Sequence, residues 1–270
     1  MSNTPVSDIH RSIRRGEPIS KYGLIWHPVK MEHYEEFCAA KPALLLRQST
    51  LPAKYAAMDF LSAVYAMDYD SITSTGKPIG NFYRLCLMLA MALRLPLEHL
   101  DALIRIEAGN GRNIQSLIIQ QESTIARITP AQFRSIRQII AEQNGETLPD
   151  ESDNAELIQA EQEFAEIRSE SLEYDIDALL DSVAYNSGVS LDEIMQWTIR
   201  QFEIRRKTIR RDKLFSIYTQ AEMSGMVKFT KGNPYPSYEF DRRKNGLDVL
   251  IAEREIAEKY GKVADMKLPQ

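Results

Sequence analysis

The sequence predicts a mainly α (α+β) fold, made of helical domains with short β-hairpin elements near residues 19–29 and 226–240. Three observations lead to this prediction. Apolar residues recur at the three- to four-residue spacing of a helix through most of the chain. Two short segments instead combine apolar and aromatic residues with Gly and Pro, which is typical of hairpins. Hydrophobic residues make up 44% of the 270 positions and charged residues 26%, which suits a globular protein with a sizeable core.

The first predicted element is a hairpin within GEPISKYGLIWHPV, residues 16–29. Lys21-Tyr22-Gly23 suits a turn between two short apolar runs. Pro28 ends the second run, because proline cannot donate a hydrogen bond to a strand ladder.

Helical spacing follows the hairpin. We expect helices over residues 31–40, 52–67 and 81–94. A further helix is expected to begin at Pro96, because proline suits the first helical position. A loop is expected over residues 68–81, where Asp, Ser, Gly and Pro are concentrated.

The clearest helix start in the sequence lies at Thr129. Thr129-Pro130-Ala131-Gln132 provides an N-cap, a proline in the first turn and a Gln three residues after the cap, which is the capping-box pattern. Asn144-Gly145 supplies the stop signal for this helix. The preceding segment, residues 112–128, is ambiguous, because SLIIQQ and TIARI fit either a small hairpin or a helix.

The composition divides the chain into three parts. Acidic residues dominate from Glu146 to Asp181, where Arg168 is the only Lys or Arg. We therefore expect a domain boundary near residues 145–155. The predicted parts are an N-terminal α+β domain over 1–145, an acidic linker or exposed helix over 146–170, and a C-terminal helical domain with a terminal hairpin and helix over 171–270.

Residues with metal-binding or catalytic chemistry are scattered. His27, His33 and Cys38 lie close together but fit no common zinc-site spacing. STGKPIG, residues 74–80, contains Gly-Lys but lacks the earlier glycine of a phosphate-binding loop. The four histidines have no nucleophile-elbow sequence beside them. We expect a non-enzyme with no catalytic residues, no metal and no cofactor.

The sequence also bears on cellular location. The longest apolar run, residues 85–93, is too short to span a bilayer and predicts a buried core helix. No apolar region follows the basic residues of the N-terminus, as it would in a signal peptide. Cys38 and Cys86 have no C-x-x-C spacing and are expected to be reduced thiols. We expect an intracellular protein without a membrane segment.

DNA binding is an alternative function. Residues 179–207 have the pattern of a helix-turn-helix with Gly188 at the turn, and arginines follow. Asp192 and Glu193 at the start of the second helix would repel phosphates, as would the acidic block upstream. The net charge of −5 also argues mildly against general nucleic-acid binding.

A helix is predicted from Val189 to about Gln220, with seven basic side chains over residues 200–213, and an aromatic strip follows it. Methionine adapts to varied partners and tyrosine gives amphipathic contact area, so this composition suits a protein–protein surface. The alternative is that Val227–Phe229 and Tyr238–Phe240 form a hairpin that folds back to close the domain. The candidate residues of the strip are Met223, Met226, Phe229, Tyr235, Tyr238 and Phe240.

Four segments together resemble a group of tailed-bacteriophage morphogenesis proteins from prophage tail modules, of the tail assembly chaperone type. They are GEPISKYGLIWHPVKMEHYEEF, ITPAQFRSIRQIIAEQNG, SVAYNSGVSLDEIMQWTIRQFE and YTQAEMSGMVKF, and the resemblance covers roughly residues 11–240. It implies a helper in the bacterial host cytoplasm that keeps the long apolar helices of the tape-measure protein soluble during tail-tube assembly. Such proteins carry no catalytic residues. Many are shorter than this chain, so a structural tail or baseplate component of the virion is a further alternative.

A chaperone for an amphipathic helix needs an apolar groove with adaptable side chains. We expect a groove beside Trp197 and Phe202, with the aromatic strip as a further contact surface. The expected partner is the tape-measure protein or another tail protein. Self-association of the chain stays open.

Overall fold

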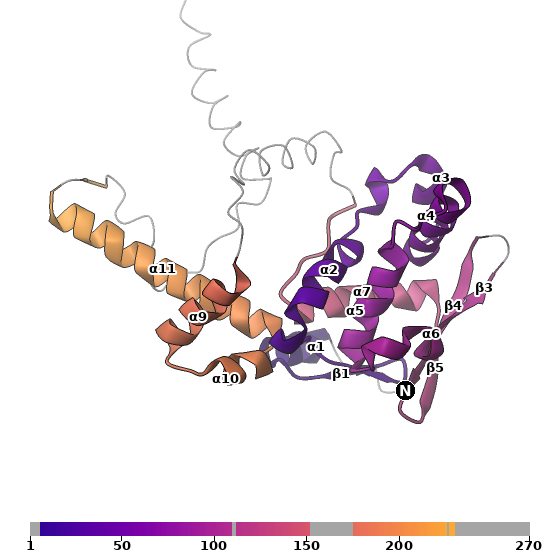
Figure 1. The fold of residues 1–270 in the computed structure, drawn as a ribbon, viewed down its shortest axis with the longest axis horizontal. Helices are drawn as coiled ribbons and strands as arrows, with labels where there is room; N and C mark the ends of the chain where they lie inside the picture. The colour runs from indigo at the N-terminus through magenta and orange to yellow at the C-terminus, as the bar shows by residue number, and fades with distance from the viewer. Residues whose placement is uncertain (1–5, 110–111, 152–174, 226, 230–270) are drawn as a thin grey trace, which may run out of the picture. The chain divides into compact units, whose positions relative to one another are not determined.

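The computed structural model describes residues 6–109, 112–151, 175–225 and 227–229 (Figure 1). These residues form a mainly helical α+β fold with two small antiparallel sheets, which confirms the predicted fold class. The chain divides into two compact units, Met1–Ile209 and Arg210–Gln270. The first unit contains both sheets and the large hydrophobic core.

The hairpin predicted near residues 19–29 is present. Its strands are β1 (Ile19–Lys21) and β2 (Leu24–Trp26), which pair antiparallel. Tyr22 and Gly23 have φ values of 56° and 81°, so both turn residues adopt the left-handed backbone that a two-residue hairpin turn requires. Trp26 is completely buried, and its indole Nε1 donates to the Lys21 carbonyl at 3.1 Å.

Two helices form the centre of the core. α5 (Asn81–Leu93) is buried at every position from Leu85 onward, as the apolar run predicts. It packs against α2 (Tyr34–Leu44), which follows the 3₁₀ turn η1 (Met31–His33) after the hairpin. Burial on all sides explains why α5 has an apolar run and no polar face.

The helix predicted over 52–67 is divided into two helices, and the first part of the loop predicted over 68–81 is helical instead. After the 3₁₀ turn η2 (Gln48–Thr50), the chain forms α3 (Ala53–Ala56) and then α4 (Phe60–Thr75). Asp59 starts α4 by accepting a hydrogen bond from the Ser62 amide at 2.9 Å. Four hydroxyl side chains near the end of α4 donate hydrogen bonds to backbone carbonyls of the helix or of the following loop, which makes them compatible with a helix. They belong to Ser71, Thr73, Ser74 and Thr75.

Asp68 provides a second reason why this polar segment is helical. Its carboxylate is buried and accepts the backbone amides of Gly80, Asn81 and Phe82. The side chain thus satisfies the free amides at the start of α5 from the neighbouring helix. A residue typical of loops therefore has a tertiary role inside α4.

The second sheet resolves the ambiguous segment 112–128 as strands. Its order is β3-β4-β5, all antiparallel, with β3 (Ile104–Ala108), β4 (Ile114–Gln121) and β5 (Thr124–Ile128). Helical structure does begin after Pro96, as expected, but it is short: only η3 (Leu97–His99) and α6 (Leu100–Leu103) precede β3. Pairing of Ile104 with Ile119 draws the chain into the sheet instead.

The capping box predicted at Thr129 is present. The Thr129 hydroxyl accepts from the Gln132 amide, and the Gln132 side chain accepts from the Thr129 amide, at the start of α7 (Pro130–Gln143). Phe133 and Ile140 bury their side chains in the core. At the end of α7, Asn144 is buried and its Oδ1 accepts from the Val29 amide at 2.9 Å, which joins the helix to the chain after the hairpin.

The C-terminal helices join the same core. They are α9 (Ile176–Ser187), α10 (Leu191–Gln196) and α11 (Ile199–Met223). Val183, Ile194 and Phe202 are buried in one cluster with the N-terminal core residues. The compact unit therefore extends to Ile209. The composition of the sequence placed a boundary near residues 145–155. The two differ because charge composition does not show which apolar faces pack together. Most of the predicted acidic linker lies outside the described residues.

The second unit begins within α11. Its described residues include Val227–Phe229, which form no strand, and the rest of the hairpin predicted over 226–240 lies outside the described residues. The same holds for the predicted terminal helix. In the described parts of both units, no helix is both long enough and apolar enough to cross a membrane.

Candidate protein-binding groove

A groove of about 420 Å³ lies beside Trp197 in the first unit. One side comes from the turn between α9 and α10, and the other from successive turns of α11. The side chains on α11 are spaced three or four residues apart, so they share one helix face. The lining residues are Val189, Glu193, Trp197, Gln201, Ile204, Arg205 and Thr208.

The backbone of Trp197 is fixed from two directions. Its amide donates to the Ile194 carbonyl at 3.0 Å, and its carbonyl accepts from the Met31 amide at 2.9 Å. The next residue, Thr198, forms an isolated antiparallel bridge with Lys30, and the Ile199 amide donates to the Val29 carbonyl at 3.0 Å. Trp197 itself is half-buried, so part of it is open to a partner on a backbone that is already fixed.

A second capping box explains the break between α10 and α11. The Thr198 hydroxyl accepts from the Gln201 amide at 3.2 Å, and the Gln201 side chain accepts from the Thr198 amide at 2.9 Å. The helix predicted from Val189 to about Gln220 runs through this point, so that prediction missed the break. Thr198-Ile199-Arg200-Gln201 was the available signal, since it repeats the pattern that marks the start of α7.

The groove combines apolar and charged side chains. Ile204 is 50% exposed beside Trp197. The Arg205 guanidinium carbon lies 5.9 Å from the centre of the Trp197 ring, within the range of a cation–π contact. Glu193 lies in the first turn of α10, where the Ser190 hydroxyl accepts from its backbone amide at 3.2 Å.

Phe202 does not line this groove, contrary to expectation. It is completely buried, and its ring meets that of Tyr34 edge-on at a centroid distance of 6.3 Å. The five-residue offset from Trp197 turns the two rings to different faces once α11 begins at Ile199. Phe202 is a core residue, and Trp197 alone of this pair is available to a partner.

The aromatic strip is described only in part. Met223 is 84% exposed at the end of α11. Phe229 is half-buried, and its ring lies 5.4 Å from that of Tyr218. The remaining predicted contact residues, Met226, Tyr235, Tyr238 and Phe240, lie outside the described residues.

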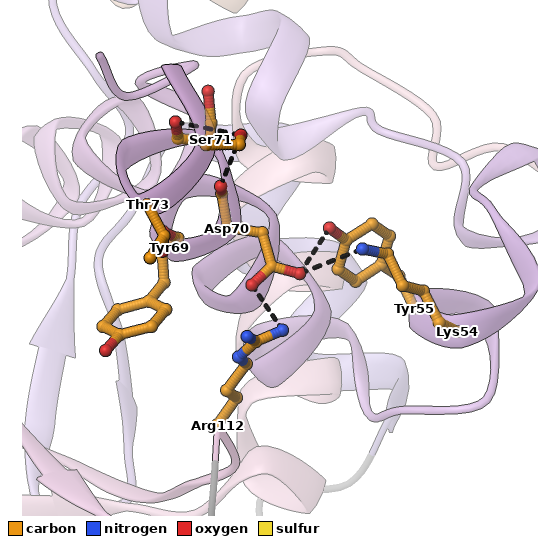
Figure 2. A network of polar contacts seen from close by, with 8 residues as sticks. Lys54, Tyr55, Tyr69, Asp70, Ser71, Thr73 and Arg112 are labelled. Atoms are coloured by element: carbon orange, nitrogen blue, oxygen red, sulfur yellow. Dashed lines mark hydrogen bonds and ion pairs between the residues drawn. The ribbon is translucent and has the colours of Figure 1, made fainter. Parts of the chain in front are cut away.

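A second hollow, of about 510 Å³, surrounds Asp70 on α4 (Figure 2). The Asp70 carboxylate accepts from Lys54 Nζ at 3.0 Å and from the Tyr55 hydroxyl at 2.9 Å, and it pairs with Arg112. The hydrogen bonds from Lys54 and Tyr55 hold the pKa of Asp70 below its ordinary value. The cluster links α3, α4 and the chain before β4.

The donors around Asp70 indicate a structural role. The hydroxyls of Ser71, Thr73 and Ser74 all donate to backbone carbonyls and have no proton left for an anion. Asp70 itself occupies the space between the two cations (Figure 2). The arrangement therefore favours a polar clamp within the fold over a ligand site.

A third hollow, of about 1250 Å³, lies along the first turns of α7 and includes Arg137. Arg137 is only 7% exposed and donates to the carbonyls of Leu44 and Leu46 at 2.7 and 2.6 Å. Its guanidinium carbon lies 3.6 Å from the centre of the Phe60 ring. Burial lowers its pKa to about 10, so it stays charged near neutral pH. The residue satisfies free carbonyls at the end of α2 and serves the fold.

The remaining chemistry of the described residues is limited. They contain no group of three or more His, Cys, Asp or Glu side chains that could hold a metal ion. Burial raises the pKa of the Cys86 thiol to about 12, which leaves it protonated and unreactive.

The structure contains only part of the predicted helix-turn-helix. Gly188 does end α9 in the left-handed conformation. The second helix, α10, is only six residues long, however, and its first turn carries Asp192 and Glu193. This is a poor surface for a DNA groove.

Scans against protein families, curated proteins and solved structures give no match to this chain.

Proposed function

We propose that this chain is a non-enzymatic protein that binds a helical segment of another protein. One observation carries the proposal: half-buried Trp197 lies at the break between α10 and α11, on a backbone fixed by hydrogen bonds, in a groove with Ile204 and Arg205. Tryptophan and arginine dominate the binding energy of many protein interfaces. A fixed backbone at this anchor also lowers the entropy that binding must overcome.

The proposed partner is the tape-measure protein of a bacteriophage tail, and the proposed role is that of a tail assembly chaperone in the bacterial host cytoplasm. The resemblance of four segments to proteins of this type supports this choice. One of these segments, residues 182–203, includes Trp197 and several other residues of the groove. An amphipathic helix laid in a groove is an established mode of peptide recognition.

Co-expression with the tape-measure protein of the same phage module tests the proposal. We expect the two proteins to co-purify, and the Trp197→Ala variant to retain at least about tenfold less partner, because large aromatic anchors commonly contribute 2 kcal/mol or more. Tyr185→Ala is the matched control, since Tyr185 is 86% exposed on α9 and does not line the groove.

Mass spectrometry of purified virions separates the alternatives. A chaperone is expected to be absent from virions. Finding the chain there in stoichiometric amounts would make it a structural tail or baseplate component, and retention of the partner by Trp197→Ala would remove the groove from the proposal.

A further inference from the structure

The arginines on and near the groove differ in whether they have a partner within the protein. Arg200 donates to the Glu142 carbonyl at 2.9 Å, and Arg206 pairs with Glu203 at 2.6 Å. Arg205 is exposed, and within the described parts of the chain it has no ion-pair partner. It is the cation that the groove offers to a ligand.

The acidic side of the groove is already stabilised. Glu193 lies in the first turn of α10, next to Asp192, where the positive end of the helix dipole favours negative charge. Ser190 completes the cap of the same turn. Of the two charged side chains that line the groove, Arg205 is the one that lies against the Trp197 ring, so a ligand group placed at that ring meets a positive charge.

The dimensions suit a short helix. The lining residues of α11 run from Gln201 to Thr208, which is about two turns or roughly 10 Å of helix. The apolar part of the surface consists of Val189, Trp197 and Ile204. A partner helix crossing it would present one large apolar side chain, with its neighbours three or four residues away at the rim.

We infer that the groove selects an acidic amphipathic helix, which places an apolar side chain against Trp197 and a carboxylate against Arg205. A guanidinium lying over an aromatic ring keeps its N–H edge free, and that edge matches a carboxylate with two parallel hydrogen bonds. This inference rests on the proposed helix-binding function and adds the chemistry of the partner.

Two synthetic helical peptides test it against the full chain. Both carry the same apolar face, and the flanking rim positions are Glu in one peptide and Lys in the other. Fluorescence anisotropy at low salt should show the Glu peptide binding at least about tenfold more tightly, and the preference should shrink as salt screens the charges. Arg205→Glu should reverse the preference.

Lys207→Glu is the matched control. Lys207 is exposed on the same helix and undergoes the same change of charge, but it does not line the groove. We expect this variant to keep most of the preference for the Glu peptide. A reversal equal to that of Arg205→Glu would overturn the inference, because the effect would then be one of general charge.

The inference and the proposed function fail in different ways. Equal binding of both peptides, unchanged by Arg205→Glu but abolished by Trp197→Ala, would overturn acidic selection and leave helix binding intact. Absence of binding by either peptide would overturn the inference as well, while co-purification with the tape-measure protein would still decide the proposed function. Circular dichroism of each variant confirms that the fold is retained.

Discussion

α7 and α11 begin in the same way and end in different surroundings. Each starts with a Thr-x-x-Gln capping box, at Thr129 and at Thr198. α7 then buries seven of its 14 residues, whereas among the 25 residues of α11 only Ile199 and Phe202 are buried. The difference teaches that local signals fix where a helix begins, while tertiary packing decides how much of it belongs to the core. The proposed binding groove lies on the helix that packs less.

The largest effect should come from the core anchor of each helix. Phe133→Ala and Phe202→Ala should each lower the free energy of unfolding by about 3–5 kcal/mol, since both side chains are fully packed. Urea denaturation measures this. Ile204→Ala is the control, and at 50% exposure it should cost less than about 1 kcal/mol. A small loss for Phe202→Ala would break the comparison, because Phe202 would then not anchor α11 in the core.

The next largest effect should be a difference in stability between variants of Arg137 and of Arg205. Arg137→Met keeps the apolar stem but removes the donors to two buried carbonyls, and should cost about 2–3 kcal/mol. Arg205→Met should change stability by less than about 0.5 kcal/mol, because Arg205 is exposed. Thermal unfolding of both variants provides the measurement. Equal destabilisation would show that Arg205 supports the fold and would weaken its assignment to a partner.

The capping boxes should give equal, smaller effects. Thr129→Ala and Thr198→Ala should each cost about 1 kcal/mol, whereas Thr→Ser at either position should cost less, because serine retains the capping hydroxyl. Chemical denaturation of the four variants tests this. No loss at Thr198 would mean that the bridge with Lys30 alone starts α11.

Acid should leave the contrast between the two helices intact while it weakens the cluster around Asp70. The folded-state pKa of Asp70 lies below its ordinary value of 3.8, so its stabilising contribution is fully present above that value and is lost as the pH falls through the folded-state pKa. The difference in melting temperature between the natural chain and Asp70→Asn should therefore shrink on acidification below about pH 4. A difference that stays constant would mean that the Asp70 carboxylate contributes no charge-dependent stability.

Sequence reasoning succeeded where a strong local signal coincided with burial. The turn at Tyr22-Gly23, the buried helix α5 and the capping box at Thr129 were all predicted. Sequence reasoning failed where a polar side chain forms hydrogen bonds to another element of the fold. Asp68 indicated a loop, yet its carboxylate caps α5 from within α4.

The candidate binding groove was likewise predicted only in part from the sequence. The sequence alone pointed to Trp197 and Phe202 as large apolar side chains near each other, and it contained the Thr198-x-x-Gln201 signal that separates them. Only the tertiary structure placed Phe202 in the core and Trp197 in a groove. The physical reason is the bridge between Lys30 and Thr198, a long-range backbone contact that acts together with the local capping box to fix where α11 starts.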